Sequence, residues 1–209
     1  MDGGEFMAVK DHTLDEKIIS AAKAEFLKHG YQKASLHKIV EVAGITTGAL
    51  YTRYKNKDEL FCSLIIPALQ EIAAKAGPLT EGYMKAQNTG NAEAIISAIR
   101  SESRFYLDLL FEHYDECVLL FCKSEGSSIR ENLDRMMEQK SRQTVEYLKS
   151  ISHREVDFDG VEFIMSEQFH YYRKILQKGY TKEKALSCME TVEEFLEAGW
   201  KSLFEKILS

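Results

Sequence analysis

Apolar residues recur every three or four positions along most of the chain, a spacing that predicts amphipathic α-helices. The first such stripe lies within residues 13–30, and a Thr-x-x-Glu capping box at Thr13 precedes it. Gly30 follows the stripe, where a residue that tolerates positive φ suits the end of a helix. The chain has only two prolines, which also fits a mostly helical protein. We therefore predict an all-α fold.

Residues 35–57 contain two short predicted helices separated by a tight turn. Ser35 and Thr46 stand where these helices would begin, and each has a hydroxyl that can cap an N-terminus. Gly44 stands where the first helix would end. Two helices joined by a short turn with glycine are the outline of a helix-turn-helix. The second helix is short and mostly small or polar, which suits insertion into the major groove of DNA.

The rest of the chain predicts longer helices. A connecting helix is expected over residues 58–76, ending at Gly77-Pro78, with a kink at Pro67 because proline cannot donate a backbone hydrogen bond. Further helices are expected over residues 94–113, 128–150, 159–179 and 181–208, with a short buried segment at 117–123. The last helix has apolar positions on two faces, so it needs a packing partner beyond its own domain.

The net charge of −6 argues against DNA binding only until its distribution is considered. Residues 31–57 carry five Lys or Arg residues against Glu41 alone, a net charge of +4, and the rest of the chain is acidic. A basic patch on an acidic body lets one end of a protein bind phosphates. We find no apolar run close to the ~18 residues of a membrane span and no signal peptide, so a cytoplasmic protein without a membrane partner is expected.

Catalysis and a metal cofactor have little support in the sequence. We find no nucleophile–base pair, phosphate-binding loop or paired carboxylates at a consistent spacing, so we predict that the protein is not an enzyme. The four cysteines have unrelated spacings and are predicted to be free thiols of a reducing compartment. His113 and Cys117 would share a helix face, but no third and fourth ligands are evident, and neither a metal site nor a cofactor is predicted.

One pattern within residues 13–61 is specific. It runs Ala-Ala…Phe…Gly-Tyr, Ser-x-x-x-Ile, Ala-Gly, Gly-x-Leu-Tyr and Lys-x-x-Leu, and is carried without a gap by Ala21, Ala22, Phe26, Gly30, Tyr31, Ser35, Ile39, Ala43, Gly44, Gly48, Leu50, Tyr51, Lys57 and Leu60. This pattern resembles the N-terminal domain of the TetR/AcrR family of transcriptional repressors. Val40 departs from it, because the family usually has Ala there.

The resemblance implies two domains. A three-helix helix-turn-helix DNA-binding domain would span residues 13–57, after a disordered N-terminus at residues 1–12. A larger helical ligand-binding and dimerisation domain would span 58–209, with the connecting helix at 58–76 and a dimerisation hairpin at 159–208. Pairing of two hairpins would give a homodimer that places two recognition helices in successive major grooves of a palindromic operator.

The resemblance also implies which residues contact double-stranded DNA. The residues expected to face the groove are Thr46, Thr47, Gly48, Ala49 and Tyr51. Those expected to reach the backbone or flanking bases are Ser35, His37, Lys38, Arg53, Tyr54, Lys55 and Lys57. His37 could equally be a solvated histidine. Because few long polar side chains lie on this helix, we expect modest base reading supplemented by backbone contacts and DNA shape.

A small-molecule inducer site in the larger domain is a further implication of the resemblance. The residues considered for its lining are Phe105, Tyr106, Leu109, His113, Phe121, Met137, Tyr147, Met165, Phe169, His170 and Tyr171, each of which could instead be plain core. The resulting hypothesis is a homodimeric repressor that an inducer releases from its operator. A helix-turn-helix that docks protein and a ligand-independent regulator stay open as alternatives.

Overall fold

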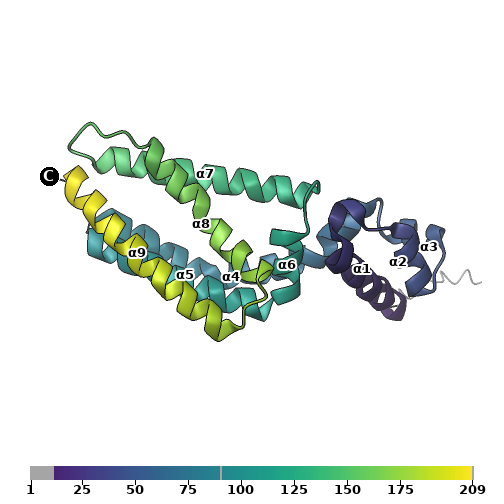
Figure 1. Cartoon of the computed structure of the whole chain (residues 1–209). Coiled ribbons are helices and arrows are strands. Elements are labelled where there is room, and N and C mark those ends of the chain that lie inside the picture. Colours follow the sequence, from purple (N-terminus) through teal and green to yellow (C-terminus); the bar gives the residue numbers. More distant parts are fainter. Residues whose placement is uncertain (1–11, 90, 209) are drawn as a thin grey trace, which may run out of the picture.

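A computed structural model describes residues 12–89 and 91–208, and within these ranges the chain folds into α-helices without a strand, which confirms the all-α prediction. The helices are α1 (His12–Lys33), α2 (Leu36–Ala43), α3 (Thr47–Arg53), α4 (Lys57–Thr89), α5 (Ala92–Glu112), α6 (Tyr114–Cys122), α7 (Ser128–Ile151), α8 (Asp159–Gln177) and α9 (Lys182–Leu208). Figure 1 shows α1–α3 at one end of an elongated molecule and the C-terminus at the other. The disorder expected over residues 1–12 stays a prediction for residues 1–11, which lie outside the described ranges, whereas His12 begins α1.

The helices α1–α3 and the start of α4 share one hydrophobic core, and we call this unit the head. Phe26 of α1 and Phe61 of α4 are fully buried there, with their rings in an edge-to-face arrangement at a centroid distance of 4.9 Å. The Tyr31 ring lies 5.1 Å from that of Phe61. Burying one such side chain stabilises the fold by roughly 1.5–3 kcal/mol. The core positions predicted for Phe26 and Tyr31 are therefore confirmed.

α4 is longer than the sequence predicts. It continues through Gly77-Pro78 to Thr89, so the expectation that the connecting helix ends near residue 76 is wrong. Pro78 leaves the carbonyl of Ala74 without its helical donor, at a cost of about 3 kcal/mol, but Ala74 is exposed, so water can replace the donor. Past the proline, Tyr83 and Ala86 pack against a second hydrophobic core, and this packing holds the last turns in place.

α4 also contains an 18-residue window with a mean hydropathy of 1.3, which meets the length and composition of a membrane span. The expectation that no such stretch exists in the chain was therefore too strong. α4 packs against α1, α5 and α6, and a helix in a protein core passes the same test. One such helix is weak evidence for a membrane segment.

The second half of the molecule is a helical domain in which α9 packs along α5, and α8 packs against α6 and α7. Its largest hydrophobic core includes Leu148 of α7 and Trp200, Phe204 and Ile207 of α9. Gly179 follows the end of α8, and its φ of 59° allows Tyr180 N–H to donate back to the Ile175 carbonyl at 3.3 Å. The two helices predicted after residue 159 are therefore present as α8 and α9, although α8 packs mainly on α6 and α7, and α9 on α5.

The loop between α6 and α7, residues 123–127, connects this domain to the head, and we call it the linking loop. Tyr31 N–H donates to the Lys123 carbonyl at 2.7 Å, which fixes the loop to the end of α1. At the start of α7, Ser128 donates to the Asp58 carboxylate from its N–H at 2.9 Å and from its hydroxyl at 2.5 Å. The linking loop and the first residue of α7 thus contact both helices that carry the head.

Candidate nucleic-acid interface and ligand cavity

α2 and α3 form the helix-turn-helix through the caps that the sequence predicts. Ser35 caps α2 by accepting the N–H of Lys38 at 3.4 Å, and Thr46 caps α3 by accepting the N–H of Ala49 at 3.1 Å. Gly44 lies between the helices with φ 65° and ψ 37°, the left-handed conformation expected of it. These local contacts set the angle at which α3 projects from the head.

Most of the residues predicted to contact DNA lie on the surface of the head. The exposed ones are Ser35, His37, Lys38, Thr46, Thr47, Gly48, Tyr51 and Lys55, and the half-buried ones are Ala49, Arg53, Tyr54 and Lys57. Tyr51 leaves 50% of its surface exposed although it is aromatic, whereas the adjacent Leu50 is buried in the core of the head. α3 is therefore anchored by Leu50 and presents Tyr51 and the two threonines outward.

The basic side chains of this surface differ in what they already contact. Arg53 of α3 forms an ion pair with Asp15 of α1, which holds the recognition helix against the first helix. Lys38 pairs with Glu41 at 3.0 Å, but both side chains are exposed, so this pair contributes little and can exchange for a phosphate. Lys55 forms no ion pair with any described residue. Lys38 and Lys55 are therefore more available to DNA than Arg53.

Lys57 has a structural role that its sequence position does not reveal. Its Nζ donates to the Gln32 carbonyl at 3.1 Å and lies 5.1 Å from the centre of the Tyr31 ring. Partial burial lowers the pKa of Lys57 from its ordinary value. The side chain thus ties the start of α4 to the end of α1, and a phosphate would compete with these contacts.

The C-terminal domain contains a cavity of about 360 Å³ whose wall comes from α4 to α9 and is mostly apolar. Of the residues predicted to line a ligand site, Tyr106, Leu109, Phe121 and Tyr171 line this cavity. A volume of this size falls in the range of sites that bind small organic molecules. Part of the predicted ligand site is therefore brought together at one cavity, from α5, α6 and α8.

The other predicted lining residues lie elsewhere. Tyr147 and Met165 pack in or against the core around Trp200, and Met137 packs against the core of the head. Phe105 lines a separate hollow. His170 is 3.1 Å from Glu167 of its own helix, and nothing is described of the Phe169 side chain.

Sequence reasoning missed the charged residues of the cavity wall: Arg100, Glu102, Lys140, Glu193 and Glu197. Charged residues on an amphipathic helix are ordinarily taken as its solvated face, which is why they were passed over. A signal was available on α5, because Glu102 falls between Ile99 and Tyr106 at the three- and four-residue steps of an inward stripe.

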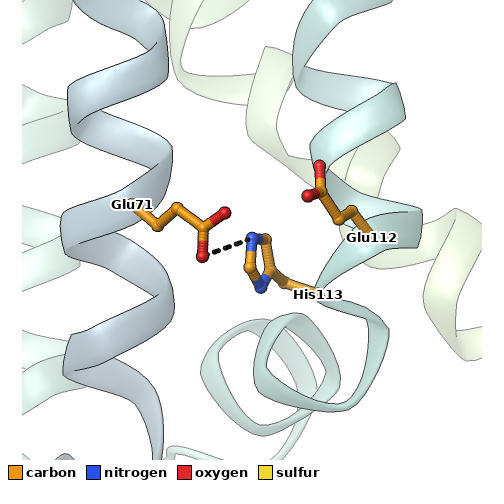
Figure 2. A group of neighbouring side chains, drawn as sticks. All are labelled: Glu71, Glu112 and His113. Carbon is orange, nitrogen blue, oxygen red and sulfur yellow. Dashed lines mark ion pairs between the residues drawn. The ribbon is translucent and has the colours of Figure 1, made fainter.

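His113 lies outside the cavity, in a cluster with Glu71 and Glu112 (Figure 2). One ligand atom from each of the three lies within 4.8 Å of the others, and His113 Nε2 is 3.6 Å from Glu71 Oε2. However, Lys75 Nζ lies 2.7 Å from Glu71 and 2.6 Å from Glu112, and its hydrogen bond lowers the pKa of Glu71. An ammonium between the carboxylates already supplies the positive charge, so the cluster is an ion-pair network between α4 and α5 rather than a metal site.

Comparison with known proteins relates the head to one family. Residues 18–64 match the profile of bacterial regulatory proteins, tetR family. The probable acrEF/envCD operon repressor of Escherichia coli is 36% identical over 59 residues, 27% of each chain. The HTH-type transcriptional regulator TtgR of Pseudomonas putida is 43% identical over 49 residues, 23% of each chain. The alignments thus span about a quarter of the length of these curated relatives.

The likeness extends to the whole fold in solved structures. MexZ, a key repressor responsible for antibiotic resistance in Pseudomonas aeruginosa, aligns with a TM-score of 0.51 at 20% identity, covering 92% of this chain and 96% of that one. A Clostridium perfringens putative fatty acid metabolism regulator aligns with a TM-score of 0.50 at 16% identity, covering 92% and 99%. At these identities the likeness concerns the fold alone. Over residues 18–64, the head is thus similar to the bacterial regulatory proteins of the tetR family.

Proposed function

We propose that this protein is a cytoplasmic transcriptional repressor that binds double-stranded operator DNA as a homodimer and leaves it when a small-molecule inducer occupies the cavity. The observation that carries the proposal is the capped helix-turn-helix, which presents Thr46, Thr47 and Tyr51 outward and falls within the matched family segment. The relatives named above as repressors support the same direction of regulation.

On DNA, α3 would lie in the major groove. Gly48 is exposed and has no side chain, so the backbone of α3 can approach the bases or the phosphates closely. The hydroxyls of Thr46 and Thr47 would donate to phosphate or a base edge, and that of Tyr51 to phosphate. Lys55, which has no ion-pair partner in the described chain, would neutralise a flanking phosphate. His37, Lys38 and Ser35 would contact the backbone from α2.

Dimerisation would use the hairpin of α8 and α9. Three large apolar side chains of this hairpin are exposed: Phe163 at 72%, Ile164 at 47% and Phe195 at 80%. Large apolar side chains left exposed on a surface are candidates for burial in a protein interface. In a two-fold dimer, the same surface of both subunits would cover them and set two α3 helices about 34–36 Å apart, or further on bent DNA.

Ligand control would act through the cavity. A ligand moves the protein off DNA only if it binds the released state more tightly than the bound state. α6 carries Leu120 and Phe121 of the cavity wall and leads directly into the linking loop, whose Lys123 carbonyl holds the end of α1. A ligand that displaces α6 would therefore change how the head is held.

The proposal is tested by selecting duplexes from a random library with the full chain and measuring affinity by fluorescence anisotropy. We expect an inverted repeat, with affinity that falls steeply as salt rises because phosphate contacts release counterions. Tyr51→Ala is expected to weaken binding about tenfold or more. The matched control is Met84→Ala, which removes a side chain of 59% exposure on α4 and should change nothing.

The alternatives predict different results. A helix-turn-helix that docks protein would enrich no duplex, and Tyr51→Ala would then leave no DNA affinity to reduce. A ligand-independent regulator would enrich an inverted repeat but keep its affinity whatever occupies the cavity. Steady turnover of a small molecule would contradict the prediction, made from the sequence, that the protein is not an enzyme.

A further inference from the structure

Four charged groups at the α9 side of the cavity neutralise one another. The Arg100 guanidinium lies 3.6 Å from Glu193 through Nε and 3.5 Å from Glu197 through Nη1. Lys201 Nζ lies 2.9 Å from the other oxygen of Glu197. Two cations thus face two carboxylates: Arg100, Glu193 and Glu197 line the cavity, and Lys201, which is not a lining residue, offsets the charge of Glu197.

Glu102 of α5 differs from these groups. It lines the cavity, is half-buried, and forms neither a hydrogen bond nor an ion pair with another residue of the described chain. Burial raises the pKa of Glu102, and the charge of Lys140 opposes that rise without forming a contact. An unpaired carboxyl group in an apolar wall is costly to ionise, because little water solvates its charge. A cation that pairs with it therefore gains more binding free energy than it would at a solvated carboxylate.

The surroundings of Glu102 favour a cation as well. Tyr106 and Tyr172 line the same cavity. Burial raises the pKa of each, that of Tyr172 to about 12; the charge of Glu102 adds to the rise at Tyr106, and the charge of Glu193 and, less, that of Glu102 add to it at Tyr172. The Tyr172 hydroxyl already donates to the Ser103 carbonyl at 3.5 Å, so it presents its ring rather than a free donor. Aromatic faces beside a carboxylate attract organic ammonium groups.

We propose that the cavity takes an amphipathic organic cation whose charged head pairs with Glu102 between Tyr106 and Tyr172, and whose apolar body lies against the surrounding aliphatic wall. The rival is an amphipathic anion held by Lys140. That side chain is exposed, so an ion pair there is screened by water and adds little affinity, whereas Glu102 is partly desolvated. This inference rests on the proposed function, because the cavity is also the proposed inducer site.

The test uses three ligands that share one alkyl chain and differ in charge: decyltrimethylammonium, decanol and decanoate. Trp200 lines the cavity and is the single tryptophan of the chain, so its fluorescence reports occupancy directly. We expect the cation to bind about tenfold or more tighter than decanol and decanoate, the ratio that one charge-assisted contact supplies. Decanoate as the tightest of the three would overturn the proposal.

Two variants assign the effect to Glu102. Glu102→Gln is expected to lower the affinity for decyltrimethylammonium about tenfold and to leave that for decanol unchanged. Glu112→Gln, on the same helix but outside the cavity, is the matched control and should change neither. If Glu102→Gln does not fold, Lys140→Glu tests the same charge preference from an exposed position of the cavity wall. It replaces a positive charge by a negative one and should therefore raise the affinity for the cation. An unchanged cation affinity in either variant would overturn the assignment.

Failure of this inference can be told from failure of the proposed function by adding the selected duplex. Release of duplex by decyltrimethylammonium but not by decanoate supports both the repressor function and the cationic ligand class. Release by decanoate alone overturns the ligand class and leaves the repressor function standing. If no duplex is bound at all, the repressor function fails, and the fluorescence titration still decides which charge the cavity prefers.

Discussion

Phe195→Glu is the substitution that most directly tests the proposed dimer. Phe195 lies in the middle of α9 with 80% of its surface exposed, the largest value among the exposed large apolar side chains of the described chain. The substitution removes no packing within the subunit, because so little of the ring is buried there. Any large effect must therefore come from what covers the ring in the assembly.

The magnitude follows from the area of the ring. An aromatic side chain buries about 150–250 Å² when it is covered completely, so 80% exposure leaves about 120–200 Å² for a partner. At about 25 cal/mol per Å² this corresponds to about 3–5 kcal/mol, and a residue that is a hot spot of an interface loses about 2 kcal/mol or more on truncation. A two-fold dimer contains Phe195 twice. The dimer should therefore lose at least about 4 kcal/mol, or about a thousandfold in dissociation constant.

Sedimentation equilibrium over a range of concentrations measures this change. We expect the unchanged chain to be dimeric at micromolar concentration and Phe195→Glu to be monomeric, with the far-ultraviolet circular dichroism of a helical protein in both. Duplex affinity should fall with the dimer, because one head contacts only half of the operator. Met84→Glu is the matched control, since it also places a carboxylate at an exposed apolar position, but on α4. A Phe195→Glu protein that dimerises as tightly as the unchanged chain would refute the reasoning.

Three further results are expected. In thermal melts, Gly44→Ala should lower the free energy of unfolding by about 1–2 kcal/mol, because the φ of 65° at this position strains any side chain. Gly48→Ala should raise the free energy of unfolding by up to about 1 kcal/mol, because Gly48 is helical and the nearest atom to an added Cβ is 3.9 Å away, but it should weaken duplex binding. Burial raises the pKa of Cys117 from 9.0 and that of Tyr172 from 10.0, each to about 12. Because the folded protein holds these protons more tightly than the unfolded chain, melts at different pH should show full stability below pH 9 and a decline towards pH 12. Asp58→Asn should leave duplex affinity nearly unchanged in anisotropy but reduce its response to a cavity ligand.

The head could be predicted closely because its structure is encoded locally. The hydroxyls of Ser35 and Thr46 cap helices within three residues of themselves, and Gly44 adopts the conformation that ends α2. Each signal depends on a few neighbouring residues, so tertiary packing does not alter it. What the sequence could not provide is the pairing of cations: Arg53 meets Asp15, which lies 38 positions away.

The larger domain was predicted less well because its features depend on distant packing. Pro78 predicts a helix end by local rules, but the helix persists since Tyr83 and Ala86 pack against residues far along the chain. The cavity is similar. Apolar periodicity finds inward-facing residues such as Tyr106, but it cannot separate those that line a space from those that fill it, as Met165 does.

The contacts around α6 explain how a site in one domain could act on the other with ordinary energies. Coupling between two ligands typically amounts to about 1–3 kcal/mol. Hydrogen bonds to a charged group contribute about 1.5–3 kcal/mol, and two such contacts depend on the position of α6 and the linking loop: Lys23 of α1 lies 2.9 Å from Glu116 of α6, and Ser128 donates twice to Asp58 of α4. Because α6 also forms part of the cavity wall, weakening either contact when a ligand binds would be enough to shift the heads between two arrangements. The core around Phe26 and Phe61 also includes Leu119 and Leu120 of α6, so a displacement of α6 would reach the head through packing as well as through these contacts.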